Sequence, residues 1–322
     1  MKIKHLAVVM AAALLACAAP QKGKLNPSIS PDDPNGALLL AVYNDSAARA
    51  GAAMDRGAGP NLRISGNSTL LILAANQGAT DAAAALLARG ADPNLTEDNG
   101  MSPLLVASYK GNAPMAAMLI KNGAKVAHAN QDGQNALHAA AYGGHGKVIN
   151  ILLSAGADPD ARDKNGVTPL FVACEKGKYE AAQALLEARA NPDLANFIGH
   201  TPLMASAQAG HKEIALALLQ AGANPNRQTT RGGTALIIAA EYNMPHMVQA
   251  LARGGARMDT RDYSGATALM IAAFMGNSET VEALLEHGAN PADKNGEGAT
   301  ALDFARSAGH EGVARILIKA SR

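Results

Sequence analysis

The chain has few aromatic residues and few cysteines for its length of 322 residues. It contains no tryptophan, four phenylalanines, six tyrosines and two cysteines. A single large core normally uses more aromatic side chains to fill its volume, and 322 residues lie near the practical limit for one core. Two cysteines cannot form a disulfide framework. We therefore expect several domains or an elongated array in which small side chains let helices approach closely.

An excess of charge of one sign is also missing. Lysine and arginine number 28, aspartate and glutamate number 27, and the formal net charge is +1. Proteins that bind nucleic acid normally carry a strong basic excess or a basic stripe, and so do polybasic membrane anchors. The composition therefore argues against both classes.

A long hydrophobic run is missing too, but a shorter one stands at the N-terminus. Lys2 and Lys4 precede an apolar run from Leu6 to Ala19. A membrane-spanning helix needs about 20 apolar residues, so this run is too short to cross a bilayer. Basic residues followed by a short apolar run are typical of a secretory signal.

The end of this run, Leu14-Leu15-Ala16-Cys17, resembles the lipobox of bacterial lipoproteins. The resemblance implies a signal peptide at residues 1–16, cleavage before Cys17, and acylation (palmitate) of its thiol and new amino group. Ala18 follows, which in lipoproteins of enterobacterial type favours transfer to the outer membrane. The alternative is a plain signal peptide cleaved near Ala18–Ala19 with an incidental cysteine. Residues 17–33 would be the lipidated cysteine and a proline-rich, extended tether, which places the protein in the periplasm.

A period of 33 residues runs without insertion from Pro34 to the C-terminus. The helix-opening position, here called the cap slot, is Gly36, Thr69, Ser102, Asn135, Thr168, Thr201, Thr234, Thr267 and Thr300. Leucine stands two residues after every cap slot, and alanine stands five residues after it in eight repeats. Unbroken periods of this length indicate stacked repeats, none of which buries its apolar face alone.

The motif within this period resembles the ankyrin family, most legibly in residues 167–177, 200–223 and 299–317. The resemblance implies an all-α solenoid of nine stacked repeats over residues 34–322, each a helix-turn-helix with a β-hairpin tip. The cap-slot hydroxyl or amide would cap the first helix, and proline after it (Pro103, Pro169, Pro202) suits the first helical position. Gly36 offers no such cap in the first repeat. Arg189 occupies a slot where other repeats carry glycine in the left-handed conformation.

No catalytic or metal-binding constellation is apparent. His138, His145, His211 and His310 occupy slots at which ankyrin repeats carry histidine, and there it usually hydrogen-bonds loops between repeats. The other histidines show no metal-ligand spacing. Cys174 lies in a row of small residues, so we expect a buried, inert thiol. The sequence thus predicts a protein that is not an enzyme and holds no cofactor and no metal.

Ankyrin arrays bind proteins through the hairpin tips and the concave face of the first helices, which directs attention to the seventh and eighth positions after the cap slot. Five of the ten aromatic residues lie at these positions, and two more lie at tips. Exposed aromatic residues, methionine and arginine are typical of interfaces. The predicted partner-binding residues at these places are Tyr43, Tyr109, Tyr142, Glu175, Lys176, Phe197, Glu241, Tyr242, Tyr263, Phe274 and Met275. The alternative is that some rings pack along neighbouring inner helices without a partner.

A cluster of arginines forms a second candidate surface. Arg227, Arg231, Arg257 and Arg261 lie on the tips of adjacent repeats, and an acidic partner docking there would involve Arg227, Arg231 and Arg261. Asp259 and Asp262 stand nearby and can neutralise two of these charges, so a solvated surface is the competing interpretation.

The leading functional hypothesis is a monomeric, non-enzymatic binding protein, anchored by lipid in the periplasm, whose partner is another protein. One form is an immunity protein that neutralises a secreted toxin such as a phospholipase effector, by analogy with periplasmic lipoproteins of that role. A second is a scaffold supporting an envelope or oxidative-stress enzyme. The alternative class is a small-molecule receptor or enzyme with a site in the concave groove. Membrane contact is expected through the N-terminal lipid only, and no nucleic acid is expected.

Overall fold

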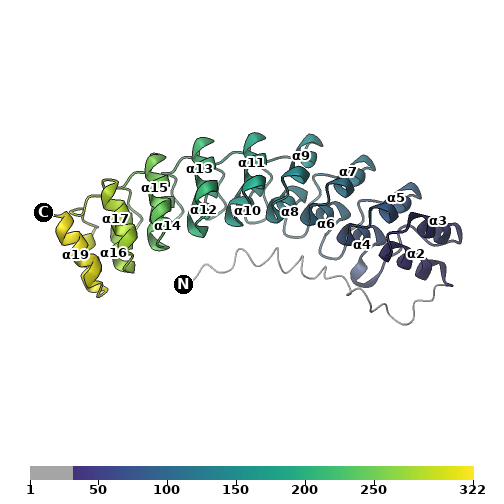
Figure 1. The fold of residues 1–322 in the computed structure, drawn as a ribbon, viewed down its shortest axis with the longest axis horizontal. Helices are drawn as coiled ribbons and strands as arrows, with labels where there is room; N and C mark the ends of the chain where they lie inside the picture. Colours follow the sequence, from purple (N-terminus) through teal and green to yellow (C-terminus); the bar gives the residue numbers. More distant parts are fainter. Residues whose placement is uncertain (1–31) are drawn as a thin grey trace. The chain divides into compact units, whose positions relative to one another are not determined.

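The computed structural model describes residues 32–322, so the predicted signal peptide, Cys17 and residues 18–31 of the tether lie outside the described residues. The described chain divides into two compact units, one ending at Asp158 and one starting at Pro159. Each unit consists of helix pairs, and the described residues form eighteen α-helices and no strand (Figure 1). The predicted all-α repeat class is therefore confirmed. None of the described helices has the length and apolar character needed to span a bilayer.

The first unit contains four helix pairs in chain order. The inner helix of each pair has an even number and the outer helix an odd number (Figure 1). The bounds are α2 (Pro34–Tyr43), α3 (Ala47–Asp55), α4 (Leu70–Gln77), α5 (Thr80–Ala88), α6 (Pro103–Lys110), α7 (Ala113–Lys121), α8 (Ala136–Gly143) and α9 (Gly146–Ser154), with a short 3-10 helix, η1 (Ser65–Asn67).

The second unit contains five helix pairs with the same alternation. Their bounds are α10 (Pro169–Glu175), α11 (Tyr179–Glu187), α12 (Pro202–Ala209), α13 (Lys212–Gln220), α14 (Ala235–Glu241), α15 (Pro245–Arg253), α16 (Ala268–Met275), α17 (Ser278–Glu286), α18 (Ala301–Ser307) and α19 (Glu311–Ala320). Within each unit, successive inner helices contact one another, and so do successive outer helices.

The cap slots start the inner helices as the sequence predicts. From the second repeat on, the side chain at the cap slot accepts a hydrogen bond from a backbone N–H of the first turn, for example Thr234 Oγ1 from Ile237 N at 3.2 Å. The three helices with proline after the cap slot begin at that proline. These local contacts satisfy N–H groups that have no partner within the helix.

The expectation that the first repeat lacks a cap is wrong. Helix α2 begins at Pro34, two residues before the cap slot, and the carboxylate of Asp33 accepts the N–H of Gly36 at 2.9 Å. The proline-rich surroundings of Asp33 predict that it belongs to the tether, but it is the N-cap of the first helix. Aspartate followed by proline at the first helical position is a favourable helix start. The 33-residue period does not reveal it, because both residues come before the cap slot at which the other inner helices are capped.

The core is a row of leucines and alanines between inner helices. The leucines two residues after the cap slot are almost fully buried from Leu38 to Leu269, whereas Leu302 in the last repeat is partly exposed. The alanine slot is buried throughout, and Ser206, which replaces alanine once, donates its hydroxyl to Leu203 O at 2.8 Å. Small side chains here allow the close helix packing that a chain so poor in aromatic residues requires.

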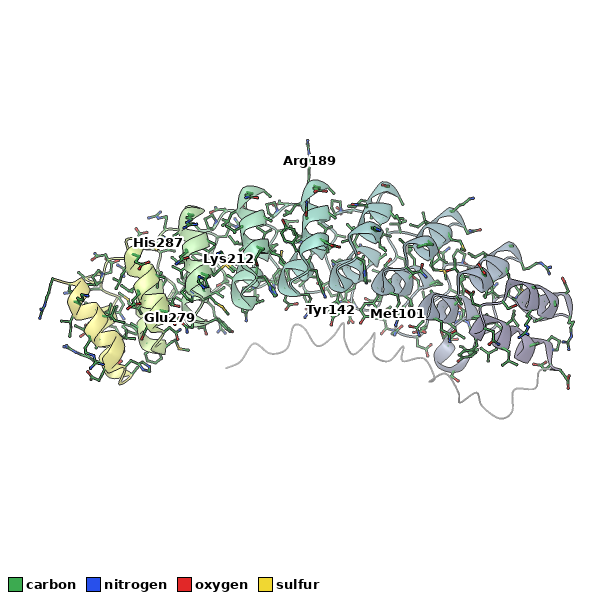
Figure 2. The ribbon with its side chains drawn as sticks, in the orientation of Figure 1. Met101, Tyr142, Arg189, Lys212, Glu279 and His287 are labelled. Atoms are coloured by element: carbon green, nitrogen blue, oxygen red, sulfur yellow. The ribbon has the colours of Figure 1, made fainter. Side chains whose placement is uncertain are left out.

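Four residues other than glycine adopt the left-handed conformation at turns where other repeats have glycine. Asp45 (φ +47°) and Asn243 (φ +54°) stand between inner and outer helices, Arg189 (φ +61°) follows helix α11, and Asn67 (φ +60°) stands in the tip before α4. The strained backbone predicted at Arg189 is therefore present, and its side chain extends away from the helix end into solvent (Figure 2). Asp45 and Asn243 use their side chains to bond the next repeat, which compensates for their backbone conformation.

Candidate partner-binding surface

The described residues offer no obvious catalytic or metal centre. No group of three or more histidine, cysteine, aspartate or glutamate side chains among them is arranged to hold a metal ion. Cys174 is fully buried, and burial raises the pKa of its thiol well above the usual range. The thiol therefore stays protonated and has little nucleophilic character, as its place in the small-residue row predicts.

The histidines at the ankyrin slots have structural contacts. His145 Nε2 lies 2.9 Å from Tyr109 O of the preceding repeat. The rings of His211 and His310 lie over Gly177 and Gly276, where an added Cβ would come within 3 Å of them. His138 is fully buried, and its Nδ1 lies 2.7 Å from Asn135 Oδ1 in the cap of α8. None of these contacts points to a ligand.

The tips, which connect each outer helix to the next inner helix, are joined to one another by a repeating hydrogen bond. The residue six positions before the cap slot donates its side chain to the carbonyl 33 residues later. These bonds run from Arg63 to Thr96 O, from Arg162 to Ala195 O, from Gln228 to Arg261 O and from Arg261 to Lys294 O. Arg261, a predicted partner-binding residue, therefore holds two tips together. Its bonds to carbonyl oxygens, which include Gly265 O, leave its positive charge in place.

The acidic residues near the arginine cluster are engaged locally. Asp259 forms an ion pair with Arg257 at 3.2 Å, which lowers the pKa of its carboxyl. Asp262 accepts the backbone N–H groups of Ser264 and Ala266 at 2.9 Å and the Ser264 hydroxyl. The prediction that these two carboxylates neutralise arginines therefore holds for Asp259 and Arg257. Arg227 and Arg231 are both exposed, and they remain the candidate residues of this cluster.

Two aromatic rings project from tips of the second unit. Phe197 and Tyr263 both stand four residues before a cap slot, and their side chains are 67% and 76% exposed. Each ring lies against the glycine of the preceding tip, Gly166 for Phe197 and Gly232 for Tyr263, where a Cβ would approach the ring to 2.8 Å. Ile198 is also exposed beside Phe197, although the slot pattern does not indicate it as a binding residue.

A second group of exposed residues lies on the inner helices of the second unit. Tyr242 follows the end of α14, and Phe274 and Met275 end α16; all three side chains are more than two-fifths exposed. Tyr242 accepts a hydrogen bond from Gln208 Nε2 at 3.0 Å, and the Phe274 ring meets the edge of Phe304 at 6.2 Å between centroids. Glu241, the last residue of α14, is exposed beside Tyr242.

The inner helices of the first unit present a less exposed set. Tyr109 of α6 and Tyr142 of α8 are half-buried, and their rings lie 5.8 Å apart, with Lys110 Nζ 5.9 Å from the Tyr109 centroid. Tyr43 is also half-buried, and burial raises the pKa of its hydroxyl. The contact between Tyr109 and Tyr142 therefore follows the alternative in which aromatic side chains pack along neighbouring inner helices.

The predicted pair Glu175 and Lys176 bonds internally. Lys176 Nζ lies 3.2 Å from Glu175 Oε2, and both side chains are partly exposed at the end of α10. Sequence reasoning also missed Tyr179, which begins helix α11 and is 47% exposed on the outer row. Its position after the inter-helix turn lies outside the slots that the ankyrin resemblance implicates.

Comparison with known proteins agrees with this architecture. The family model for ankyrin repeats, which describes three copies, matches residues 71–163, 155–229, 218–295 and 236–322. The chain belongs to the ankyrin repeat family. Ankyrin repeats indicate a protein–protein interaction module, and they are generally not enzymes. The residues that bind a partner in this particular ankyrin chain remain a prediction.

Two solved ankyrin structures illustrate the similarity. The ankyrin repeat domain of human ASB11 is 31% identical with a TM-score of 0.61, and the alignment covers 68% of this chain and 98% of that one. The ankyrin repeat domain of Bcl-3, a unique member of the IkappaB protein family, is 32% identical with a TM-score of 0.62, covering 69% and 100%. No curated protein sequence was found to match the chain.

Proposed function

We propose that this ankyrin chain is a non-enzymatic binding protein of the bacterial periplasm, anchored by lipid on Cys17, which binds another protein through the inner helices of its second unit. The observation that carries the binding proposal is the exposure of Tyr242, Phe274 and Met275 on adjacent inner helices. These residues stand at the slots that ankyrin proteins use for partners. Large apolar side chains at a protein surface contribute most when a partner removes them from water.

The contacts around these side chains favour binding further. Gln208 holds the Tyr242 hydroxyl, and Phe304 packs against the Phe274 ring. Side chains that are already positioned lose less conformational entropy on association. Glu241 adds a charge at the rim of the same surface, where it contributes to specificity more than to affinity.

The test compares two variants in affinity capture from an envelope fraction. A Tyr242→Ser/Phe274→Ser variant should capture at least tenfold less of the parent's main partner, because each lost ring removes about 1.5–3 kcal/mol of apolar burial. Tyr179→Ser is the matched control, since it removes an exposed ring from an outer helix. Equal capture by the double variant and the control, with both folded, would contradict the assignment of this surface.

The anchor is supported by the sequence Leu14-Leu15-Ala16-Cys17 and is tested separately. Replacement of Cys17 by serine should abolish incorporation of labelled palmitate and move the mature protein from the membrane to the soluble periplasmic fraction. A plain signal peptide predicts no palmitate incorporation in the parent either, so labelling of the unmodified protein decides between the two interpretations.

The specific role that we propose is immunity to a secreted toxin, such as a phospholipase effector. It is supported by the combination of an export signal with a binding array and rests on analogy. A strain lacking the protein should lose viability in co-culture with toxin-bearing siblings and regain it with the parent gene but not with Tyr242→Ser/Phe274→Ser. Survival of the deletion strain would contradict the immunity role but not the binding role. In that case we expect the capture experiment to identify a scaffold partner, such as an envelope or oxidative-stress enzyme.

A further inference from the structure

Three successive tips of the second unit carry an alternation of apolar and cationic side chains. Phe197 and Ile198 lie on the first tip, Arg231 on the second and Tyr263 on the third. Phe197 and Tyr263 are the two most exposed large hydrophobic side chains of the described residues. We call these four residues the tip row. They are separate from the inner-helix surface of Tyr242, Phe274 and Met275.

The backbone holds the tip row in a defined arrangement. Thr230 N and Thr230 Oγ1 donate to Ile198 O at 3.1 and 3.2 Å, which joins the first tip to the second. Tyr263 N donates to Arg231 O at 3.2 Å, which joins the second tip to the third. The two rings lie over Gly166 and Gly232, so their exposed faces point away from rigid backbone.

The electrostatics of the middle tip are strongly cationic for so short a segment. Residues 224–233 contain Arg227 and Arg231 and no carboxylate, and both arginines are exposed. The neighbouring tips carry the carboxylates of Asp193, Asp259 and Asp262. None of them forms an ion pair with Arg227 or Arg231, since Asp259 pairs with Arg257. Asp193 accepts the N–H of Asn224 at 2.9 Å, and Asp262 accepts two backbone N–H groups and a hydroxyl.

We propose that the tip row docks on the surface of an anionic phospholipid bilayer, with the side chains of Phe197, Ile198 and Tyr263 at the headgroup–acyl boundary and Arg227 and Arg231 on lipid phosphates. Aromatic side chains are favoured at this boundary because a ring has an apolar body, and in tyrosine also a polar tip. Arginine binds phosphate through a planar fork of donors, and each basic residue near an anionic surface adds to membrane affinity. This membrane contact is additional to the N-terminal lipid, and it does not depend on the protein partner proposed above.

A bilayer fits the tip row better than a protein partner does. Protein interfaces are also enriched in aromatic residues and arginine, but neither Arg227 nor Arg231 has an ion-pair partner among the described residues, and lipid phosphates supply one for each. At a membrane surface the same alternation is accommodated, because apolar side chains enter the boundary while cations remain among the headgroups. Three large apolar side chains in a line suit such a shallow contact.

The absence of tryptophan from the chain allows a direct test. We would use residues 17–322 with Cys17→Ser, the processed chain without its lipid, carrying Phe197→Trp or Tyr263→Trp as a single reporter. Vesicles of phosphatidylethanolamine and phosphatidylglycerol (3:1) should shift the tryptophan emission to shorter wavelength, and brominated lipid should quench it. Tyr179→Trp, on helix α11 away from the tips, is the matched control and should show neither effect.

Vesicle flotation of the same processed chain without tryptophan measures the charge contribution. Arg227→Gln/Arg231→Gln should lower the partition coefficient about twentyfold, since each basic residue near an anionic surface is worth about fivefold. Arg189→Gln is the matched control and should change it little. Binding should weaken with added salt and be largely lost on vesicles of phosphatidylcholine alone.

The proposal is overturned if the tip reporters show neither shift nor quenching, or if flotation is unchanged by the double arginine substitution. It is also overturned if the tip reporters respond to a captured envelope protein and not to vesicles, which would make the tip row a protein-docking site. The inner-helix variant Tyr242→Ser/Phe274→Ser should bind vesicles as the parent does. Failure of the membrane proposal and failure of the protein-binding proposal are therefore distinguishable.

Discussion

At the residue scale, a few positions depart from the 33-residue pattern, and each departure has a measurable energetic consequence. The pattern places alanine or another small apolar residue along the inner helices. Ser108 of α6 is a hydroxyl in that environment, fully buried, and its Oγ has no hydrogen-bond partner. A buried polar group without a partner keeps the cost of its lost hydration.

We therefore expect Ser108→Ala to raise the free energy of unfolding by about 1 kcal/mol. Ser206→Ala is the matched control, because the Ser206 hydroxyl is equally buried but donates to Leu203 O. The control should be neutral or slightly destabilising. Urea denaturation followed by circular dichroism measures both, and a destabilised Ser108→Ala variant would show that the hydroxyl has a favourable contact.

Arg189 gives a second prediction at this scale. Its backbone adopts φ +61°, a conformation that costs a residue with a Cβ roughly 1 kcal/mol relative to glycine. Arg189→Gly should therefore raise the free energy of unfolding by about 1 kcal/mol, which appears as a higher urea midpoint. Arg253→Gly, in the last turn of α15, should lower it by about 0.5–1 kcal/mol, since glycine is a poor helix former. A lower midpoint for Arg189→Gly would mean that the arginine side chain stabilises the fold.

His200 links stability to pH. Burial beside the Phe171 ring, 5.9 Å between centroids, lowers the pKa of its imidazole from 6.5 to about 4. Between pH 6.5 and 4 the unfolded chain binds this proton and the folded chain does not. The stability associated with the neutral ring is thus complete above pH 6.5 and is lost as the pH falls to 4, by about 3 kcal/mol.

Between pH 7 and 4.5 the parent loses unfolding free energy as His200 resists protonation in the folded state. In His200→Gln this loss should be smaller by about 2 kcal/mol. Denaturation curves across this range measure the effect. His246→Gln, on the exposed start of α15, serves as the control and should leave the slope unchanged. An unaltered slope in His200→Gln would show that the ring is not held neutral.

At the scale of single elements, helix starts are determined both within a repeat and between repeats. The inner helices from α4 on are capped by their own cap slots, which are visible in the sequence because the contact spans two or three residues. Outer helix α5 begins at Thr80 after Ala79, which provides no side-chain cap. Its N–H at Ala82 is instead bound by the carboxylate of Asp45, 37 residues earlier, at 2.9 Å. The departure of Asp45 from glycine therefore stabilises the next repeat.

Asp45→Ala should destabilise the start of the array by about 2 kcal/mol, through loss of the cap and strain at φ +47°. Asp45→Asn retains an acceptor and tolerates the conformation, so it should cost less than 1 kcal/mol. Hydrogen exchange of the α5 amides is the measurement. Unchanged protection of α5 in Asp45→Ala would remove the assigned role.

At the scale of the whole molecule, stability is distributed over nearest neighbours. Leu236 of α14 is almost fully buried, and α14 contacts α12 and α16. Leu236→Ala should cost about 2–5 kcal/mol, and it should accelerate hydrogen exchange in α12, α14 and α16 before the first unit. Leu302→Ala, at the same slot of the partly exposed last repeat, should cost less. Simultaneous loss of protection in both units would show that the chain unfolds as one cooperative structure.

The sequence alone determined the repeat register, the helix pairs, the caps, the leucine and alanine core and the left-handed turns, including Arg189. These features depend on contacts within about 33 residues, which a strict period makes visible. The sequence missed the Asp33 cap, because that helix start lies outside the period. It left open whether Tyr109 and Tyr142 face a partner or pack along neighbouring inner helices, since slot position alone does not reveal that the two rings lie 5.8 Å apart.

Only the tertiary structure decided which side chains at equivalent slots are available to a partner or a membrane. Tyr242, Phe274, Phe197 and Tyr263 are exposed, whereas Arg261 is used to join two tips. The reason is physical: the exposure and the hydrogen bonding of a side chain depend on what stands beside it one repeat away.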